Sequence, residues 1–213
     1  MTISVVSASD EPAGQFAAHI PALVRATGPM SYDYIFGPHE PLYREFMAQA
    51  WATPDNFFSH TQSVLALEDG AFRGVLIAHD GPEHYRLKDA VFPIIYGLIG
   101  QHGITPEMIA ELAARADIAS YMNPYVPNDC RYIIVVSVPE AGRGKGAGRA
   151  LMIYEIDRAR AAGYRTLHLD VMSDNPAVGL YTALGFETMA ETITPIPCRQ
   201  HGIAMELRMV LTL

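Results

Sequence analysis

The residues best suited to bind a ligand lie in a glycine-rich segment that follows a β-branched run. Residues 136–149 read VSVPEAGRGKGAGR, after an expected strand at Arg131–Val138 and before an expected helix at Arg149–Ala162. Glycines let the backbone approach a ligand closely, and the N-terminus of a helix carries a partial positive charge. The segment therefore predicts a phosphate-binding loop between a buried strand and a helix.

The charge around these glycines is opposite in sign to that of the whole chain. Fifteen basic and 23 acidic residues give the chain a formal charge of −8. Between positions 141 and 165 there are instead six basic residues and two acidic ones. A basic glycine loop in an acidic protein indicates a bound anion, and a flexible turn with solvated charges is the alternative interpretation.

Two common phosphate-loop patterns can be compared with this segment, and one of them fails. The P-loop needs Gly-Lys-Ser/Thr, but Lys145 is followed by Gly146. The dinucleotide pattern G-x-G-x-x-G/A is matched by Gly142, Gly144 and Ala147, with Asp170 at the end of the next expected strand. Too few residues follow Asp170 for the remaining βαβ units of that fold, so dinucleotide binding is kept as an alternative.

A third pattern, R-x-x-G-x-G/A, is met by Arg143, Gly146 and Gly148. Residues 138–151 read V-P-E-x-x-R-G-K-G-x-G-R-x-L, which resembles the pyrophosphate loop of the GNAT superfamily of acyl-CoA-dependent N-acetyltransferases. A second block, Asn175–Phe186, resembles that family's N-x-A-x-x-L-Y-x-x-L-G-F motif and follows one strand later. The resemblance is specific over about residues 131–190.

This resemblance implies acetyl-CoA as the cosubstrate. The main chain of the expected strand would pair with the pantetheine arm, and the glycine loop would hold the pyrophosphate through backbone N–H groups. Asn175 would bond the arm, although an Asn before Pro is also an ordinary helix cap. The implied cofactor-binding residues are Val136, Ser137, Val138, Arg143, Gly144, Lys145, Gly146, Ala147, Gly148, Arg149, Asn175 and Tyr181.

The same resemblance makes Tyr181 the expected catalytic acid. An amine that attacks a thioester forms an oxyanion and expels a thiolate. A phenol placed at the sulfur can protonate this leaving group, and backbone N–H groups near Val136 can stabilise the oxyanion. The alternative is that Tyr181 is a core aromatic that packs against the sheet.

The general base is left open by the sequence. An amine with a pKa of about 10 is protonated at neutral pH and must lose a proton before it attacks. Cys130, Tyr132, Ile134 and Val136 are expected to alternate along the strand towards the acetyl group, and none is a carboxylate or a histidine. Tyr132 is the one candidate in this strand, acting through a chain of water molecules.

The acceptor pocket of the family is usually built by the first two helices and the last hairpin. For this chain that implicates the segment 194–200 and four residues of an expected loop, in which an Asp among aromatics could receive a cationic amine. The alternative is a capped surface turn that packs its aromatics inward. The four residues are Tyr32, Asp33, Tyr34 and Phe36.

The composition excludes several other classes of protein. A charge of −8 repels phosphate backbones, so no nucleic-acid partner is expected. Cys130 and Cys198 are too few for a disulfide framework or a four-cysteine zinc site, and His79, His84 and His168 are not expected to bind metal. We expect His79 and His84 at the surface and His168 in a structural role. No metal is therefore expected.

No membrane partner is expected either. The most apolar stretch, Val91–Gly100, contains Pro93 and is too short to span a bilayer. The N-terminal residues MTISVVSASD have no basic residue before a hydrophobic run, which is unlike a secretory signal. A reducing cytoplasm is the expected compartment.

Strand and helix patterns alternate along the chain and predict a single α/β domain over residues 1–213. Asp69-Gly70 predicts a hairpin turn, and Thr105 a helix N-cap. Strands are expected at Ile3–Val6, Val64–Leu67, Phe72–His79, Arg131–Val138, Thr166–Val171, Phe186–Ile193 and Ile203–Leu211. Helices are expected at Pro12–Ala26, after Gly37-Pro38, at Leu87–Ile99, after Thr105-Pro106, at Arg149–Ala162 and at Pro176–Leu184.

The resemblance adds a topology to this order. It implies a GNAT-like domain with a central, mixed, mostly antiparallel sheet flanked by helices. Residues of about 131–190 form its CoA-binding core, and residues of about 85–128 form a helical insertion before the CoA-binding strand. The insertion either closes over the acceptor pocket as a lid or builds a homodimer interface, and the sequence does not choose between them.

The expected function is transfer of the acetyl group of acetyl-CoA to a primary amine of a small molecule or peptide. The amine attacks directly, without a covalent acyl-enzyme. The alternative is a non-catalytic acyl-CoA-binding or regulatory module, which the missing carboxylate in the strand keeps open.

Overall fold

One seven-stranded sheet forms the centre of the structure, a computed structural model that describes residues 2–12 and 14–213. The strand order is β1-β2-β3-β4-β5-β7-β6, and β4 and β5 are parallel whereas every other neighbouring pair is antiparallel. The strands are β1 Ile3–Ser7, β2 Ser63–Glu68, β3 Ala71–Asp80, β4 Cys130–Ser137, β5 Thr166–Met172, β6 Glu187–Thr192 and β7 Glu206–Thr212. The expectation of a mixed, mostly antiparallel sheet is confirmed.

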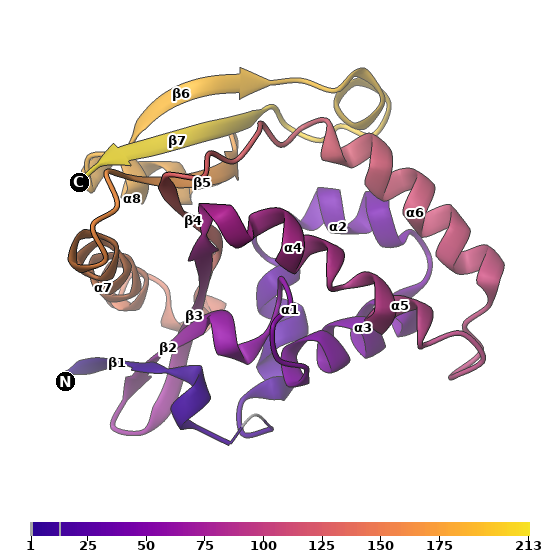
Figure 1. Cartoon of the computed structure of the whole chain (residues 1–213), viewed down its shortest axis with the longest axis horizontal. Helices are drawn as coiled ribbons and strands as arrows, with labels where there is room; N and C mark the ends of the chain where they lie inside the picture. The colour runs from indigo at the N-terminus through magenta and orange to yellow at the C-terminus, as the bar shows by residue number, and fades with distance from the viewer. Residues whose placement is uncertain (1, 13) are drawn as a thin grey trace.

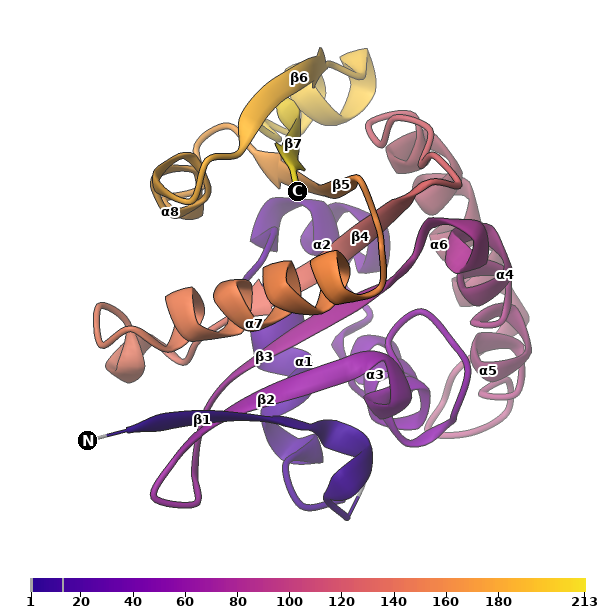
Figure 2. The same ribbon diagram turned by 60° about the vertical axis from the view of Figure 1, so that its left-hand side comes forward.

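Helices cover both faces of this sheet (Figure 1). On one face lie α1 Ile20–Arg25, α2 Pro29–Phe36, α3 Glu40–Ala52, α4 His84–Asp89, α5 Phe92–Tyr96 and α6 Pro106–Ser120. On the other lie α7 Ala147–Ala161, which crosses the strands, and α8 Ala177–Ala183 (Figure 2). Short turns are η1 Ala8–Asp10, η2 Ala17–His19, η3 His60–Gln62, η4 Gly81–Glu83, η5 Glu140–Gly142 and the π-helical η6 Ile196–Gln200.

The sheet separates two hydrophobic cores, because side chains alternate between its faces. Along β3, Val75 and Ile77 pack with the helices α1 to α6, whereas Leu76 and Ala78 pack with α7 and α8. Strands that are buried on both faces need apolar residues at every position. This explains why β2 and β4 read as continuous apolar runs and not as alternating ones.

An irregularity in β4 controls the shape of the functional region. The pairing of β3 with β4 shifts between Ile77↔Val135 and Ala78↔Ile133, which leaves Ile134 as an extra residue in β4. A β-bulge of this kind bends the strand and disturbs the alternation of side chains. Beyond it Val136 packs on the α7 side, whereas Ile134 packs on the opposite side. The expectation that Cys130, Tyr132, Ile134 and Val136 share one face is therefore wrong at Val136.

Prolines account for the largest differences from the expected helices. Pro29 lies in the first turn of α2, so the residues 32–36 that were expected in a loop are helical. Pro93 likewise lies in the first turn of α5 and divides the expected helix Leu87–Ile99 into α4 and α5. The first helix begins only at η2 and α1 and not at Pro12, and Ala13 lies outside the described residues.

The segment between β3 and β4 is mainly helical and packs against α2 and α3. Its α6 begins after Thr105, whose Oγ1 accepts a hydrogen bond from the N–H of Met108 at 3.4 Å, so the predicted cap is confirmed. The expectation that His79 and His84 lie at the surface is wrong. Both are buried, with Nε2 of His79 2.9 Å from Nδ1 of His84. Among the described helices, none is long and apolar enough to cross a membrane.

A buried ion pair ties β4 to α7. Nε of Arg131 donates a hydrogen bond to Oε1 of Glu155 at 2.5 Å, and the two side chains are 6% and 0% exposed. The same guanidinium donates to Asp80 at 2.8 Å and to the carbonyl oxygen of Ala78 at 3.0 Å. The guanidinium thus fixes the start of β4 relative to α7 and β3.

Removing one partner of this pair should destabilise the fold strongly. Glu155→Ala leaves the buried Arg131 without its buried counter-charge, and we expect a loss of about 3 kcal/mol in the free energy of unfolding. Urea denaturation followed by circular dichroism measures this loss. Asp157→Ala removes an exposed carboxylate from the same helix and is the matched control, with an expected change of about 0.5 kcal/mol or less. Equal losses for the two variants would contradict the assignment.

Candidate active site

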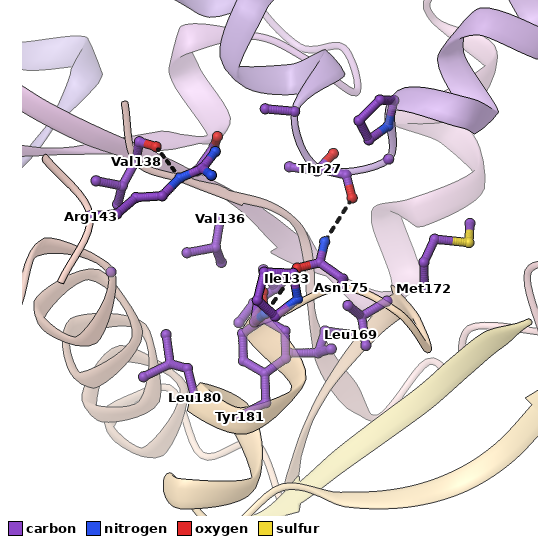
Figure 3. A pocket seen from close by; sticks show the side chains of 18 of the residues that line it. Thr27, Ile133, Val136, Val138, Arg143, Leu169, Met172, Asn175, Leu180 and Tyr181 are labelled. Carbon is purple, nitrogen blue, oxygen red and sulfur yellow. Dashed lines mark hydrogen bonds between the residues drawn. The ribbon is translucent and has the colours of Figure 1, made fainter. Parts of the chain in front are cut away.

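A cavity of about 650 Å³ opens where β4 and β5 diverge. The two strands pair from Cys130↔Thr166 to Ile133↔Leu169 and no further. Past this point, residues of both strands line the cavity together with the glycine loop, α8, the residues between α1 and α2, and the residues before β7 (Figure 3). Because β4 beyond Ile133 is paired only with β3, its main-chain groups on the other edge face the cavity.

The glycine loop closes one end of this cavity. Gly144 and Gly146 have φ values of 77° and 91°, a region that favours glycine, and Gly146 directly precedes α7. A Cβ atom added at either position would meet nothing within 4 Å, so backbone conformation and not packing requires these glycines. The first-turn N–H groups of α7 are therefore open to an anionic ligand.

The basic side chains of the loop are divided between two places. Arg143 and Arg149 line the cavity, and Nε of Arg143 donates to the carbonyl oxygen of Val138 at 3.4 Å. Nζ of Lys145 donates to the carbonyl oxygen of Ala141 at 3.0 Å, and this residue lines a separate hollow. The cavity is lined by the other predicted cofactor-binding residues, which are Val136, Ser137, Val138, Arg143, Gly144, Gly146, Ala147, Gly148, Arg149, Asn175 and Tyr181.

Among the described strands, only β4 and β5 pair in parallel, and this excludes the dinucleotide-binding alternative. That fold needs several parallel strands joined by βαβ units, whereas the strands on either side of this pair run antiparallel to it. Asp170, which would hold a ribose in that alternative, is instead held by Arg208. The glycine loop therefore does not belong to a dinucleotide-binding fold.

Asn175 connects the two sides of the cavity. Its Oδ1 accepts a hydrogen bond from the N–H of Ala177 at 2.9 Å, which caps the start of α8. Its Nδ2 donates to the carbonyl oxygen of Thr27 at 3.1 Å, across the cavity from α8 (Figure 3). The capping role anticipated as an alternative for this residue is therefore present, together with a tether to the segment between α1 and α2.

Tyr181 lies on the wall of the cavity beside Leu180 (Figure 3). Its side chain is 6% exposed, and its ring centroid lies 6.0 Å from that of Phe186. Burial raises the pKa of the phenol to about 12, so the hydroxyl keeps its proton at neutral pH. Tyr181 is a packed core aromatic and a cavity-lining residue at once.

The opposite end of the cavity is built by residues that the sequence did not indicate. Residues 26–31, Ile203 and Ala204 line it. The four residues expected there lie in α2 and outside the lining. Asp33 forms an ion pair with Arg25, the Tyr34 ring lies 4.6 Å from that of His201, and Phe36 packs on Tyr43. The acidic group expected to receive an amine is thus already paired.

Asp170 on β5 also lines the cavity. Its carboxylate accepts hydrogen bonds from both Nε and Nη2 of Arg208, and from the hydroxyl of Tyr132 at 2.7 Å. The Tyr132 hydroxyl therefore donates a hydrogen bond to a carboxylate. Burial, and to a smaller extent the charge of Asp170, raise the pKa of Tyr132 well above its usual value. Tyr132 cannot serve as the proton acceptor that its position in the strand suggested.

In the described part of the chain, no group of three or more His, Cys, Asp or Glu residues is arranged to hold a metal ion. The two cysteines are free thiols, with Cys130 buried and Cys198 partly exposed.

Comparison with protein families identifies a family for this chain. The model of the acetyltransferase (GNAT) family matches residues 32–186, which include the glycine loop and α8. A curated relative, a mycothiol acetyltransferase of Actinosynnema mirum, is 44% identical over 55 residues. These residues make up 25% of this chain and 18% of that relative, so the likeness is confined to a small part of the longer protein.

Solved structures are similar over nearly the whole chain. An N-acetyltransferase from Staphylococcus aureus Mu50 has a TM-score of 0.71 at 14% identity, covering 98% of this chain and 100% of that one. A mosquito arylalkylamine N-acetyltransferase like 5b has a TM-score of 0.59 at 16% identity, with 100% of each chain covered. At such identities these structures show a shared fold.

The tether made by Asn175 gives a test of how the two sides of the cavity are held. Asn175→Asp keeps an oxygen for the N–H of Ala177 but removes the donor to Thr27, so we expect hydrogen exchange of the amides of residues 26–31 to become about fivefold faster. Hydrogen exchange with mass spectrometry measures this rate. Thr182→Val removes another polar group from α8 and should leave residues 26–31 unchanged. Unchanged exchange in Asn175→Asp would show that the tether contributes nothing.

Proposed function

This chain belongs to the acetyltransferase (GNAT) family, and from that premise we propose that it transfers the acetyl group of acetyl-CoA to a primary amine by direct attack. The observation that carries the proposal is the cavity between β4 and β5. It joins a glycine loop suited to a pyrophosphate, an unpaired strand edge and a buried phenol in one continuous space. The acceptor would be a small molecule or a peptide amine.

The fit of acetyl-CoA to the cavity is supported by the loop itself. Gly144 and Gly146 leave open space where a side chain would stand, and the N–H groups of Ala147 and Gly148 begin a helix directly behind them. A pyrophosphate placed there would accept these hydrogen bonds and meet the partial positive charge of α7. Arg143 and Arg149 would add charge at the wall of the cavity.

The main chain of β4 would hold the pantetheine arm. Residues 136–138 line the cavity, and Val136 and Ser137 pair with β3, which leaves the other edge of β4 to accept an extended, amide-containing ligand. An N–H group near Val136 would also stabilise negative charge on the thioester carbonyl oxygen. Bound acetyl-CoA would supply an activated acyl group, and these residues would position it.

Tyr181 would act as the acid. Its phenol stays protonated at neutral pH because burial raises its pKa to about 12, and it lines the cavity. When the carbon–sulfur bond breaks, the hydroxyl would give its proton to the sulfur and regain one from the attacking nitrogen. No proton is gained or lost overall at Tyr181.

The acceptor would enter from the end lined by residues 26–31, Ile203 and Ala204. The helical segment between β3 and β4 supports this end, since Nε of Arg115 in α6 donates to the carbonyl oxygen of Ile35 in α2 at 3.0 Å. We assign to this segment the task of positioning the acceptor end. A similar mosquito protein is named for arylalkylamines, which makes that class a reasonable part of any screen.

Release of free thiol from acetyl-CoA, measured with a panel of amines, tests the proposed function. The panel should contain 2-phenylethylamine, agmatine, a polyamine and a short peptide with a free N-terminus. Turnover with any of these supports the proposal. Binding of acetyl-CoA by calorimetry without turnover across the panel would favour the non-catalytic acyl-CoA-binding module, and binding of NADH without acetyl-CoA would contradict both.

The left-handed backbone of the loop predicts a specific loss of cofactor affinity. Gly146→Ala forces a side chain onto a residue with φ of 91°, which should displace the N–H groups of the loop and weaken acetyl-CoA binding about tenfold. Gly163→Ala is the matched control, because Gly163 has φ of 81° at the far end of α7 and equally open surroundings. It should lose similar stability and no affinity. Equal affinities of the two variants in calorimetric titration would contradict the assigned loop.

Removal of the proposed acid should lower turnover more than binding. In Tyr181→Phe we expect kcat to fall about 100-fold while the acetyl-CoA affinity changes by less than about twofold, since only the proton donor is lost. Steady-state kinetics and calorimetry separate these effects. Tyr154→Phe alters a half-exposed tyrosine of α7 outside the cavity lining and should behave like the wild type. Unchanged turnover in Tyr181→Phe would remove its role as acid.

A further inference from the structure

Two buried carboxyl groups lie on neighbouring strands at the acceptor end of the cavity. Asp170 is on β5 and Glu206 is on β7, and the register pairs Asp170 with Arg208 and Met172 with Glu206. The Asp170 side chain is 4% exposed, and Glu206 as a whole is 6% exposed. Adjacent buried carboxyl groups in different surroundings often divide acid and base roles between them.

The first of these groups is fully engaged. Asp170 accepts two hydrogen bonds from Arg208 and one from Tyr132. The same guanidinium donates to the carbonyl oxygens of Tyr125 and Pro124 at 2.9 and 2.8 Å, which fixes its position. Both carboxylate oxygens of Asp170 are thus occupied by donors from the protein.

Glu206 has a different set of neighbours. Its Oε1 accepts a hydrogen bond from Nδ2 of Asn123 at 3.3 Å, and within residues 2–12 and 14–213 no cation forms an ion pair with it. The titratable and charged groups that face it are Asp170 and Arg208 in the sheet, Tyr32 from α2 and Tyr132 from β4. Burial and then the charge of Asp170 raise the pKa of Glu206 to about 8, against the opposing effect of Arg208.

Several neighbours of Glu206 line the cavity. Met172, directly opposite it across the β5–β7 ladder, is one of them and lies on the acceptor side in Figure 3. Side chains directly opposite each other in an antiparallel pair stand on the same face of the sheet. Ile203 and Ala204 line the cavity shortly before Glu206 in the chain, and Thr27 lines it beside Tyr32. Glu206 is not itself among the lining residues, but it adjoins this lining at the acceptor end of the cavity.

We propose that Glu206 takes the proton of the acceptor's ammonium group through one water molecule, which joins its carboxylate to the acceptor end of the cavity. This inference rests on the proposed acetyl transfer and adds the missing base to it. Three other candidates are engaged, since Tyr132 donates a hydrogen bond to Asp170, Asp170 is paired with Arg208, and Asp33 is paired with Arg25. Asp174 also lines the cavity, but it is exposed to solvent and is not one of these buried carboxyl groups.

The protons and bonds of this step balance. Glu206 takes one proton from the ammonium, and the lone pair that is freed on nitrogen forms the bond to the acetyl carbon. The carbon–sulfur bond then breaks, the sulfur receives a proton from Tyr181, and Tyr181 regains one from the nitrogen. Glu206 finally returns its proton to solvent, so the products are the acetylated amine, free CoA thiol and one proton.

A base with this pKa imposes a characteristic pH dependence. Only the ionised form of Glu206 can accept the proton, so kcat/KM should rise with pH through a midpoint of about 8. Without the carboxylate, only amine that has already lost its proton in solution can react. The midpoint should then move to the pKa of the amine itself, which is about 10.

Glu206→Gln tests the proposal with the amine that gives the highest turnover in the panel. We expect kcat/KM at pH 8 to fall by about 100-fold or more, and the midpoint of its pH profile to rise from about 8 to about 10. The affinity for acetyl-CoA should stay unchanged. Glu191→Gln makes the same chemical change at an exposed position of β6, and its rate and pH profile should match those of the wild type.

The stability of the same variant separates a lost base from a damaged fold. The pKa of Glu206 in the folded protein is raised above its ordinary value of 4.5, so its contribution to stability is complete below pH 4.5 and is lost as the pH rises through 8. A glutamine can still accept the hydrogen bond from Asn123 and carries no buried charge. We therefore expect Glu206→Gln to melt no earlier than the wild type, and later than it at pH 9.

The possible outcomes distinguish a failure of the role of Glu206 from a failure of the proposed acetyl transfer. A wild-type rate and an unchanged pH midpoint in Glu206→Gln would overturn the role of Glu206 and leave the proposed acetyl transfer standing. Absence of thiol release by the wild-type protein would overturn the proposed function, and the role of Glu206 with it. If Glu206→Gln does not fold, Glu206→Asp serves instead, with a reduced rate and a midpoint still below that of the free amine as the expected result. A wild-type rate in Glu206→Asp would count against the proposal.

Discussion

Strand β4 keeps its parallel partner only from Cys130 to Ile133, and the site depends on this early end to the pairing. The extra residue at Ile134 bends β4 away from β5, so two strands that begin side by side enclose a cavity where they separate. A regular parallel pair would fill this space with main-chain hydrogen bonds. Because the pairing stops, an edge of β4 is left for a ligand in the middle of the sheet, between the two hydrophobic cores.

The two faces of the sheet contribute different chemistry to this space. The α7 side supplies the glycine loop, the N-terminus of α7 and the phenol of Tyr181, which together suit an anionic cofactor with a leaving group to protonate. The opposite side carries Asp170, Arg208 and Glu206. The ion pair with Arg208 is formed by Asp170, whereas Glu206 accepts a hydrogen bond from Asn123. The proposed acid and the proposed base therefore lie on opposite faces of the sheet, and the gap between β4 and β5 is where they would meet.

How well the sequence predicted each part depended on how local its cause was. The strands, the Asp69-Gly70 hairpin, the Thr105 cap and the strand–loop–helix unit around Gly146 follow from residues close together in the chain, and all are present. The division of one expected helix at Pro93 and the helix at Pro29 were missed because a proline in a first turn begins a helix as readily as it ends one. The prediction that His79 and His84 lie at the surface was wrong because their burial depends on Phe57 and Tyr132, which come from distant segments.

By itself, the sequence determined the fold class, the glycine loop before α7 and the wall of α8 with Tyr181, since the order of apolar, glycine and cap residues governs these locally. Only the tertiary structure decided which carboxyl groups meet and in what state. Asp170, Glu206 and Arg208 come together through the register of β5 with β7, and Asn123 and Tyr32 reach Glu206 from two other elements. Burial and the pairing of Arg208 with Asp170 then set the proton affinity of Glu206, because electrostatic energies depend on distance and exposure and not on position along the chain.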